Sequence, residues 1–234
     1  MWKYWLTIFG WKLNTCFHDS GLGRLPLLGR VWSTSKRLAA KWLVSGHGVP
    51  ARLGGQPTNI HPFTIAYSIH RWEPYMAELF QNALKPCFTV LDIGAHHGYY
   101  SLFAARCVGK EGRVYAFEPT PQNFQILKKN IELNHFTNVT PVNKAIGDRC
   151  TTVPFFIREH TAVGASLFPT HCPNEFTVPV ECITIDAFLA GKPVDVVKMD
   201  IEGGEPYALE GMKKTLSESR EIVLFVEYAP DLLH

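Results

Sequence analysis

Several features that would mark a function class at once are missing from this 234-residue sequence. Its six cysteines are scattered and none forms a C-x-x-C pair, which argues against a zinc site and against a small disulfide scaffold. The uncharged run between Lys3 and Lys12 is too short to span a bilayer and lacks a cleavage site of small residues. There is no internal repeat and no low-complexity tract. We therefore expect a cytoplasmic globular protein with reduced thiols and no bound metal.

The composition is that of one main domain with an extension, since 46% of the residues are hydrophobic and 19% are charged. Charge is unevenly spread. Residues 1–60 hold eight Lys or Arg but a single acid, Asp19, so they carry +7 and the remainder, by difference from the total of +2, carries −5. We assign residues 1–62 to a basic, Trp-rich extension with a connector that includes a short hairpin, and residues 63–234 to the domain.

The extension holds five of the six tryptophans, and its apolar residues recur at helical spacing over much of residues 1–45. A helix that is apolar around most of its circumference buries against something. It docks on its own domain or on a second subunit, or it contacts a membrane surface or a lipid substrate through Trp, Lys and Arg. A basic arm alone is weak evidence for nucleic acid, and no nucleic-acid partner is expected.

Strand and helix patterns alternate in the rest of the chain, which predicts βαβ units and a parallel sheet. Ligands of such sheets bind beyond the carboxyl ends of the strands, where the strand order reverses. We expect the first and fourth strands to flank that point. The predicted elements are a helix over 72–84, a strand over 90–93, a helix over 98–108, a strand over 113–117, a helix over 121–134, a strand over 139–146, β-rich runs around 152–158 and 176–184, a strand over 194–199, a helix over 205–216 and a strand over 222–227.

The loop after the first strand resembles a dinucleotide-binding loop in which Asp92 replaces the first glycine, while Gly94 and Gly98 remain. A carboxylate at that position repels a pyrophosphate but tolerates an amino group and a cationic sulfonium, as in S-adenosylmethionine (SAM). Glu118, 26 positions further on, closes the second strand and is suited to bind two ribose hydroxyls.

Acids also follow the later strands. Asp148 suits an adenine amino group or is only a turn acid. Asp200, Glu202 and Glu227 are the candidate catalytic residues, with Asp200 favoured to orient or deprotonate a hydroxyl. Glu205 fits favourable charge at a helix start. Because adjacent side chains diverge, only one member of the His96-His97 pair is expected to face the site.

These residues carry a resemblance to the FkbM family of SAM-dependent methyltransferases. Its marks are Trp72-Glu73-Pro74, Asp92-Ile93-Gly94-Ala95, Gly98-Tyr99-Tyr100-Ser101, Phe117-Glu118-Pro119, Asn143-x-Ala145-x-Gly147-Asp148, Gly164-Ala165-Ser166 and Lys198-Met199-Asp200-Ile201-Glu202-Gly203. The resemblance implies a Rossmann-like class I methyltransferase sandwich of three layers, with a β-rich insertion between the third and fourth strands. It also implies methyl transfer from SAM to a hydroxyl of a sugar, glycolipid or other small natural product. With it we assign cofactor binding to Glu73, Asp92, Gly94, Ala95, His96, Gly98, Glu118, Ala145 and Asp148.

Two departures from the family pattern stand out. The pair His96-His97 replaces the more usual Asn and small apolar residue. The sequence also ends soon after the fifth strand, where this fold class continues with a helix and two further strands. Either the β-rich runs at 152–184 complete the sheet, or the N-terminal arm or a second subunit covers its edge, or the chain is a C-terminally truncated fragment. A non-catalytic SAM-binding module and a nicotinamide oxidoreductase are the rival functions.

Overall fold

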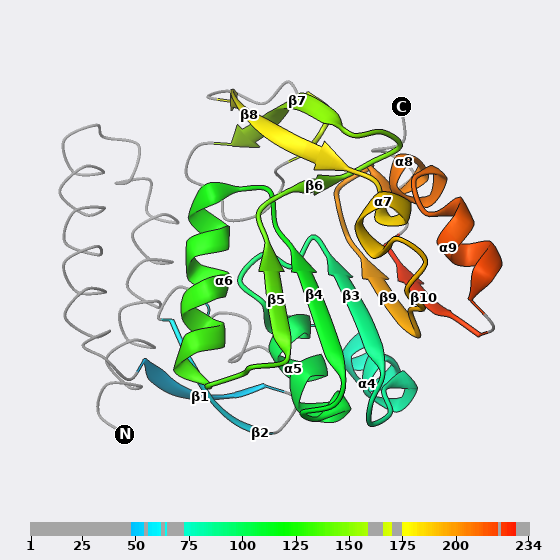
Figure 1. Ribbon diagram of the computed structural model, residues 1–234. Coiled ribbons are helices and arrows are strands. Elements are labelled where there is room, and N and C mark those ends of the chain that lie inside the picture. Colours follow the sequence, from blue (N-terminus) through cyan, green and yellow to red (C-terminus); the bar gives the residue numbers. More distant parts are fainter. Residues whose placement is uncertain are drawn as a thin grey trace, which may run out of the picture. The chain divides into compact units, whose positions relative to one another are not determined.

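The computed structural model describes residues 48–53, 56–61, 64, 73–158, 166–169, 175–219 and 221–227 (Figure 1). The predicted helical arm over 1–45 lies outside this part of the chain. The chain divides into two compact units, one of residues 1–74 with 132–135, the other of residues 75–131 with 136–234. In the first unit, β1 (Val49–Leu53) and β2 (Gln56–Ile60) pair as an antiparallel hairpin, which confirms the hairpin predicted in the connector.

The second unit is built on a five-stranded sheet in which every neighbouring pair is parallel. Its strands stand in the spatial order β10-β9-β3-β4-β5, so the order reverses between β3 and β9, the first and fourth predicted strands. The α/β fold class and the position of the reversal are confirmed. The strands are β3 (Thr89–Ile93), β4 (Arg113–Phe117), β5 (Val139–Val142), β9 (Val196–Met199) and β10 (Val223–Val226).

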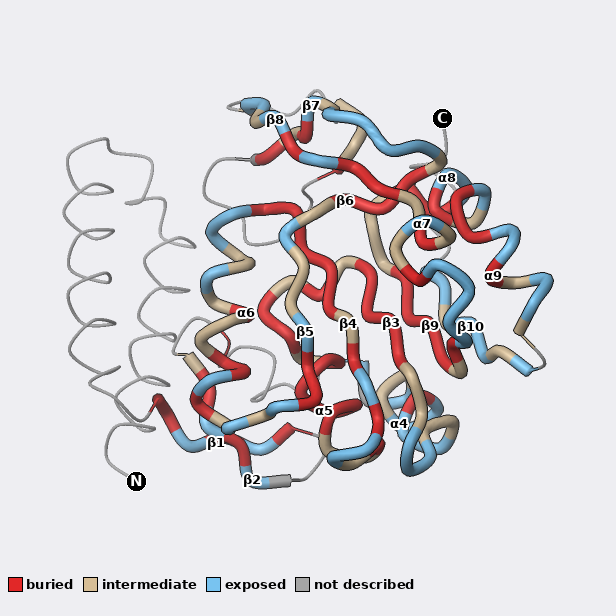
Figure 2. Tube along the Cα trace, in the orientation of Figure 1, coloured by how far each residue is buried: buried red, intermediate tan, exposed pale blue. Residues whose placement is uncertain are grey.

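Helices cover both faces of this sheet, and the central strands are buried (Figures 1 and 2). On one face, alternate strand residues such as Leu91, Val197 and Met199 pack against α7 (Ile185–Leu189), α8 (Glu205–Glu210) and α9 (Lys213–Glu218). On the other face the Phe80 ring of α4 lies 5.2 Å from Tyr100 of α5 and 5.4 Å from Phe225 of β10. The remaining helices are α4 (Pro74–Ala83), α5 (Tyr99–Val108) and α6 (Pro121–Leu133).

The predicted strand over 139–146 is wrong in extent, because it breaks into β5 and the short β6 (Ala145–Ile146). Strand β6 joins β7 (Thr151–Arg158) and β8 (Glu175–Ile183) in a separate sheet of order β6-β8-β7. The two β-rich runs therefore do not complete the main sheet. They pair with each other along eight positions and bury a core of their own. Strand β10 remains the outer strand among the residues described.

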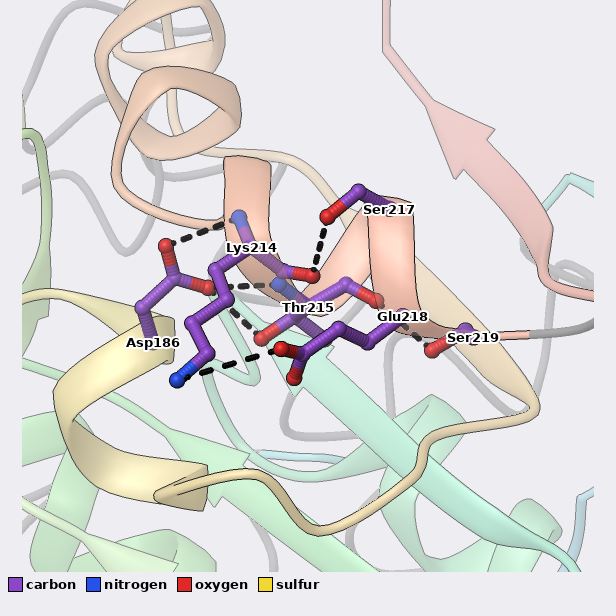
Figure 3. A network of polar contacts seen from close by, with 6 residues as sticks. All are labelled: Asp186, Lys214, Thr215, Ser217, Glu218 and Ser219. Carbon is purple, nitrogen blue, oxygen red and sulfur yellow. Dashed lines mark hydrogen bonds and ion pairs between the residues drawn. The ribbon is translucent and has the colours of Figure 1, made fainter.

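The predicted helix over 205–216 is two helices, α8 and α9, with a break at Gly211 and Met212. A Cβ on Gly211 would lie 2.0 Å from the carbonyl oxygen of Gly147, so the chain bends where these two backbones meet. The carboxylate of Asp186 in α7 accepts hydrogen bonds from the backbone N–H groups of Lys214 and Thr215 at 3.0 and 2.8 Å, and so caps the new helix start (Figure 3). Sequence reasoning did not predict α7, which spans five residues.

Candidate functional site

Backbone hydrogen bonds continue past the ends of the strands and bring the predicted residues to one edge of the sheet. The N–H of Gly94 donates to Phe117 at 3.0 Å, and the N–H of Asp200 donates to Ile93 at 3.1 Å. One strand further out, the N–H of Glu227 donates to Met199 at 2.9 Å. The residues that follow β3, β4, β9 and β10 are therefore neighbours in space, as the parallel topology predicts (Figure 1).

The two loop glycines are required by close packing inside the protein. Gly94 has φ +82°, and a Cβ there would lie 1.9 Å from the backbone oxygen of Asp200. Gly98 has φ +88° and precedes the first residue of α5, and a Cβ there would lie 2.7 Å from Leu127 of α6. Both positions favour glycine because other residues rarely adopt such φ values. Gly94 lets the tips of β3 and β9 touch, which places Asp200 beside the loop.

Glu118 is a buried carboxylate that holds this loop. Its Oε2 accepts from the N–H of His96 at 2.9 Å, and its Oε1 accepts from the N–H of Thr120 at 2.8 Å. Burial raises the pKa of Glu118 to about 7 even though these hydrogen bonds act in the opposite direction. The group is therefore poised between its neutral and charged forms near neutral pH.

Asp92 is also fully enclosed, with 1% of its surface exposed. Its Oδ2 accepts a short hydrogen bond from the hydroxyl of Ser101 in α5. Its Oδ1 is buried and faces no donor within the described part of the chain. Burial raises the pKa of Asp92, and the positive charge of Lys198 opposes that shift. One carboxylate oxygen at the end of β3 is thus left able to accept a further hydrogen bond.

The expectation that the two adjacent histidines diverge is wrong. The rings of His96 and His97 stack with centroids 3.9 Å apart and an interplanar angle of 18°. His96 has φ 51°, a left-handed conformation that turns consecutive side chains toward one another. His97 is buried, its carbonyl accepts from the side chain of Asn130 at 2.8 Å, and His96 is partly exposed. Of the pair, His96 is the one whose N–H donates to Glu118.

Asp200, the favoured catalytic residue, lies in a network of charged groups. Its Oδ2 accepts from the ammonium of Lys198 at 2.9 Å. Burial raises the pKa of Asp200, but the charge of Lys198 and a hydrogen bond from Glu227 outweigh burial, so the pKa is lowered. The hydrogen bond with Asp200, together with burial, raises the pKa of the exposed Glu227 to about 8. At neutral pH Asp200 is thus ionised and Glu227 carries the proton between them.

The family pattern includes Lys198, but the sequence alone predicts no role for this residue. The signal that could have found it is a charged residue inside the apolar run Val196–Met199, since Lys is rarely buried unless it is paired. The prediction that Glu227 shares the site of Asp200 agrees with the hydrogen bond between them.

The remaining acids at the tip of β9 differ in what they do. Glu205 is buried, and its carboxylate accepts from the N–H groups of Ile201 and Gly203 at 2.8 and 3.0 Å, so it shapes the loop before α8. Glu202 has φ 54°, and its carbonyl accepts from the hydroxyl of Ser166 at 2.9 Å. Through Ser166 the β-rich insertion is tied to this loop.

The surroundings of the other four residues assigned to the cofactor are as follows. Ala145 is in β6 with its side chain in the core of the second sheet. Asp148 pairs with Arg149, whose Nη2 lies 2.9 Å from its Oδ2, and this hydrogen bond lowers the pKa of Asp148. Ala95 is buried, and its N–H donates to Phe117 at 2.9 Å. Glu73 belongs to the first unit.

No group of three or more His, Cys, Asp or Glu side chains is arranged to hold a metal within the described residues. Among the same residues, no helix has the length and apolar character needed to cross a membrane.

A sequence model of the FkbM methyltransferase domain matches residues 92–232, which is more than half of the chain. Curated relatives include a protein-L-isoaspartate O-methyltransferase of Methanococcoides burtonii, 31% identical over 35% of this chain and 41% of the relative. Another is protein-L-isoaspartate O-methyltransferase 1 of Arabidopsis thaliana, 36% identical over 30% of this chain and 33% of the relative. The chain thus spans less than half the length of either curated relative.

Solved structures with a similar arrangement include a SAM-dependent methyltransferase from Aquifex aeolicus, with a TM-score of 0.39, 16% identity and 66% of each chain covered. A putative rRNA methylase from Clostridium thermocellum has a TM-score of 0.42 and 15% identity, and covers 67% of this chain and 69% of that one.

The parallel sheet with its reversal between β3 and β9, and the acid-glycine loop at that reversal, define a class I methyltransferase, the Rossmann-like class whose cofactor is SAM. Within this class the chain belongs to the FkbM methyltransferase family.

Proposed function

We propose that this chain transfers a methyl group from SAM to a hydroxyl oxygen of a sugar, a glycolipid or another small natural product. The observation that carries the proposal is the ionised carboxylate of Asp200, held beside the Asp92 loop by the close approach at Gly94. A carboxylate at that position can accept a hydrogen bond from an incoming hydroxyl and, later, its proton.

The residues at the ends of β3 and β4 fit the cofactor. The buried acceptor Oδ1 of Asp92, which has no hydrogen-bond partner among the described residues, suits the ammonium group of SAM, and the carboxylate of Glu118 suits the two ribose hydroxyls. When bound, SAM supplies an electrophilic methyl group on a positively charged sulfur. His96, whose N–H donates to Glu118, is proposed to contact the methionine part.

On the acceptor side, Asp200 is proposed to hold the hydroxyl in line with the methyl group. Fixing the reacting atoms in this arrangement supplies much of the acceleration. With SAM bound as the methyl donor, Asp200 would accept the proton that the hydroxyl loses on methylation. Glu227 keeps its own proton near neutral pH and steadies Asp200 through their hydrogen bond.

Two aromatic rings beside the Glu202 loop support a sugar-like acceptor. Phe168, from the insertion, and Tyr207, from α8, have ring centroids 5.4 Å apart. Tyr207 is 37% exposed, and the N–H of Phe168 donates at 3.2 Å to the Ser166 hydroxyl that binds Glu202. An exposed tyrosine ring beside a partly buried phenylalanine ring suits an acceptor ring that has an apolar face.

The test is a methyl-transfer screen with labelled SAM against hydroxylated glycans, glycolipids and phenols, with an isoaspartyl peptide as a separate arm. The Asp200→Asn variant serves as the matched control. We expect transfer to a hydroxylated acceptor, a loss of about 100-fold or more in turnover in Asp200→Asn, and SAM affinity within a few-fold of the wild type.

Each alternative has its own result in this screen. Unchanged turnover in Asp200→Asn would remove Asp200 from the reaction. Transfer only to the isoaspartyl peptide would replace the hydroxyl acceptor with a carboxyl group. SAM binding with no transfer to any acceptor would identify a non-catalytic SAM-binding module.

A further inference from the structure

A buried ammonium group stands between the two ends of the proposed site. Lys198 is 5% exposed in a strand whose other residues are Val196, Val197 and Met199. Removing an ammonium group from water costs several kcal/mol unless opposite charges and hydrogen bonds compensate. A lysine at this position therefore requires partners, and the structure shows three of them.

The first partner is Asp200, whose Oδ2 lies 2.9 Å from the Lys198 nitrogen. The second is Asp92, which stands directly beside Lys198 in the β3–β9 register, so that both side chains leave the same face of the sheet. The third is the ring of Tyr100, whose centroid is 5.0 Å from the nitrogen. Lys198 thus connects the acid after β9 to the acid inside β3.

These two acids serve opposite ends of the proposed reaction. Asp92 lies at the cofactor end and Asp200 at the acceptor end, and the strand order reverses between their strands. Carboxylates near one another repel, so each raises the pKa of the other unless a cation opposes the effect. Asp200 does raise the pKa of Asp92, and the charge of Lys198 lowers the pKa of both groups.

We propose that Lys198 is a positioning residue that couples the two ends of the site, because its buried ammonium group lies beside both Asp92 and Asp200 and holds their side chains in place. The inference rests on the proposed function. Replacement of Asp200 affects the acceptor end and replacement of Asp92 the cofactor end, whereas replacement of Lys198 affects both.

The test begins with Lys198→Met, which removes the charge and keeps an unbranched apolar chain. The carboxyl carbons of the aspartates are followed by carbon-13 NMR over pH, with the Asp200 signal assigned by its loss in Asp200→Asn. SAM affinity is measured by calorimetry on the same proteins. We expect the Asp200 midpoint to rise by about one pH unit or more and SAM to bind about tenfold or more weakly.

A second pair of variants keeps the test decisive if Lys198→Met does not fold. Asp92→Asn with Lys198→Met removes one negative and one positive charge together, so no uncompensated charge remains buried at that pair. Its matched control is Asp92→Asn alone. The Asp200 midpoint is expected to lie about one pH unit or more higher in the double variant than in this control.

A Lys198 variant that folds, with a lower melting temperature but an unchanged pH midpoint for Asp200, would show that Lys198 is merely structural. This result would overturn the inference. A wild-type protein that does not bind SAM would instead overturn the proposed function, and the NMR titration separates the two results because it needs neither cofactor nor acceptor.

Discussion

At the scale of single residues, Glu118 joins cofactor binding to protonation. Its carboxylate already fixes the His96 loop, and burial raises its pKa to about 7. Two ribose hydroxyls donate hydrogen bonds best to the ionised form. With the role proposed for Glu118, SAM binding is expected to lower the pKa of Glu118 and release a proton, which would make the affinity depend on pH.

The sign follows from linkage, since a ligand that prefers the ionised form binds more tightly as the pH rises through the pKa of the free protein. We expect the dissociation constant for SAM to fall about tenfold between pH 6 and pH 8. Calorimetry at several pH values measures it. The Glu118→Gln variant is the control, because it cannot ionise and should bind weakly with little pH dependence. A wild-type affinity that is flat over this range would contradict the role of Glu118.

Gly94 permits another test at a single residue. Gly94→Ala places a Cβ against the backbone of Asp200 at a positive φ, and we expect a loss of about 2–4 kcal/mol in the free energy of unfolding from strain and overpacking together. Gly191→Ala is the matched control, since Gly191 has φ +84° but an open space around the added atom. It should lose about 1 kcal/mol. Urea denaturation of both variants measures the difference, and equal losses would show that the contact with Asp200 does not matter.

At the scale of elements, the sequence was most informative where the pattern is local. The strands over 90–93 and 113–117 were predicted to within one residue because each is a short apolar run bounded by turn residues. The break between α8 and α9 could not be predicted, because it depends on the distant contact between Gly211 and Gly147. Strands β7 and β8 were predicted as the two β-rich runs of the insertion, but their sheet with β6 was not, since β6 pairs with β8 far along the chain.

The same distinction applies to the site. Acids at strand ends were predictable from their place in the chain, and Asp200 and Glu227 do meet. The stacking of His96 on His97 was not, because the usual rule for neighbouring side chains fails at a left-handed residue.

The cap on α9 gives a prediction at this scale. Asp186→Ala removes the acceptor of two backbone N–H groups and of the Thr215 hydroxyl, so we expect a loss of about 1–2 kcal/mol in the free energy of unfolding. Ser217→Ala is the matched control. It removes a hydrogen bond at the exposed side of the same helix and should change the free energy of unfolding by less than about 0.5 kcal/mol.

The effect at Asp186 also depends on pH. Burial alone would raise its pKa, but hydrogen bonds from Thr215 and Lys214 lower it below the ordinary value of 3.8. The stabilisation is therefore present above that value and is lost as the pH falls through the lowered pKa. Thermal denaturation at pH 7 and pH 3 tests this, and a difference between wild type and Asp186→Ala that does not shrink in acid would contradict it.

At the scale of the whole molecule, the parallel sheet and the FkbM family match point to one class of chemistry. Strand β10, at one edge of the described sheet, is its least buried strand, with Val223, Leu224 and Val226 from 36% to 42% exposed. An apolar edge of this kind tends to associate with a further strand or a partner. The proposed reaction involves β10 only through Glu227, the residue that follows this strand.

The most direct test of the central claim is a calorimetric titration of the full chain with SAM, with NAD⁺ titrated under the same conditions. The account predicts one SAM site per chain with a dissociation constant between about 1 μM and 1 mM, the usual range for enzyme substrates, and much weaker binding of NAD⁺. No binding of SAM, or tighter binding of NAD⁺ than of SAM, would contradict it.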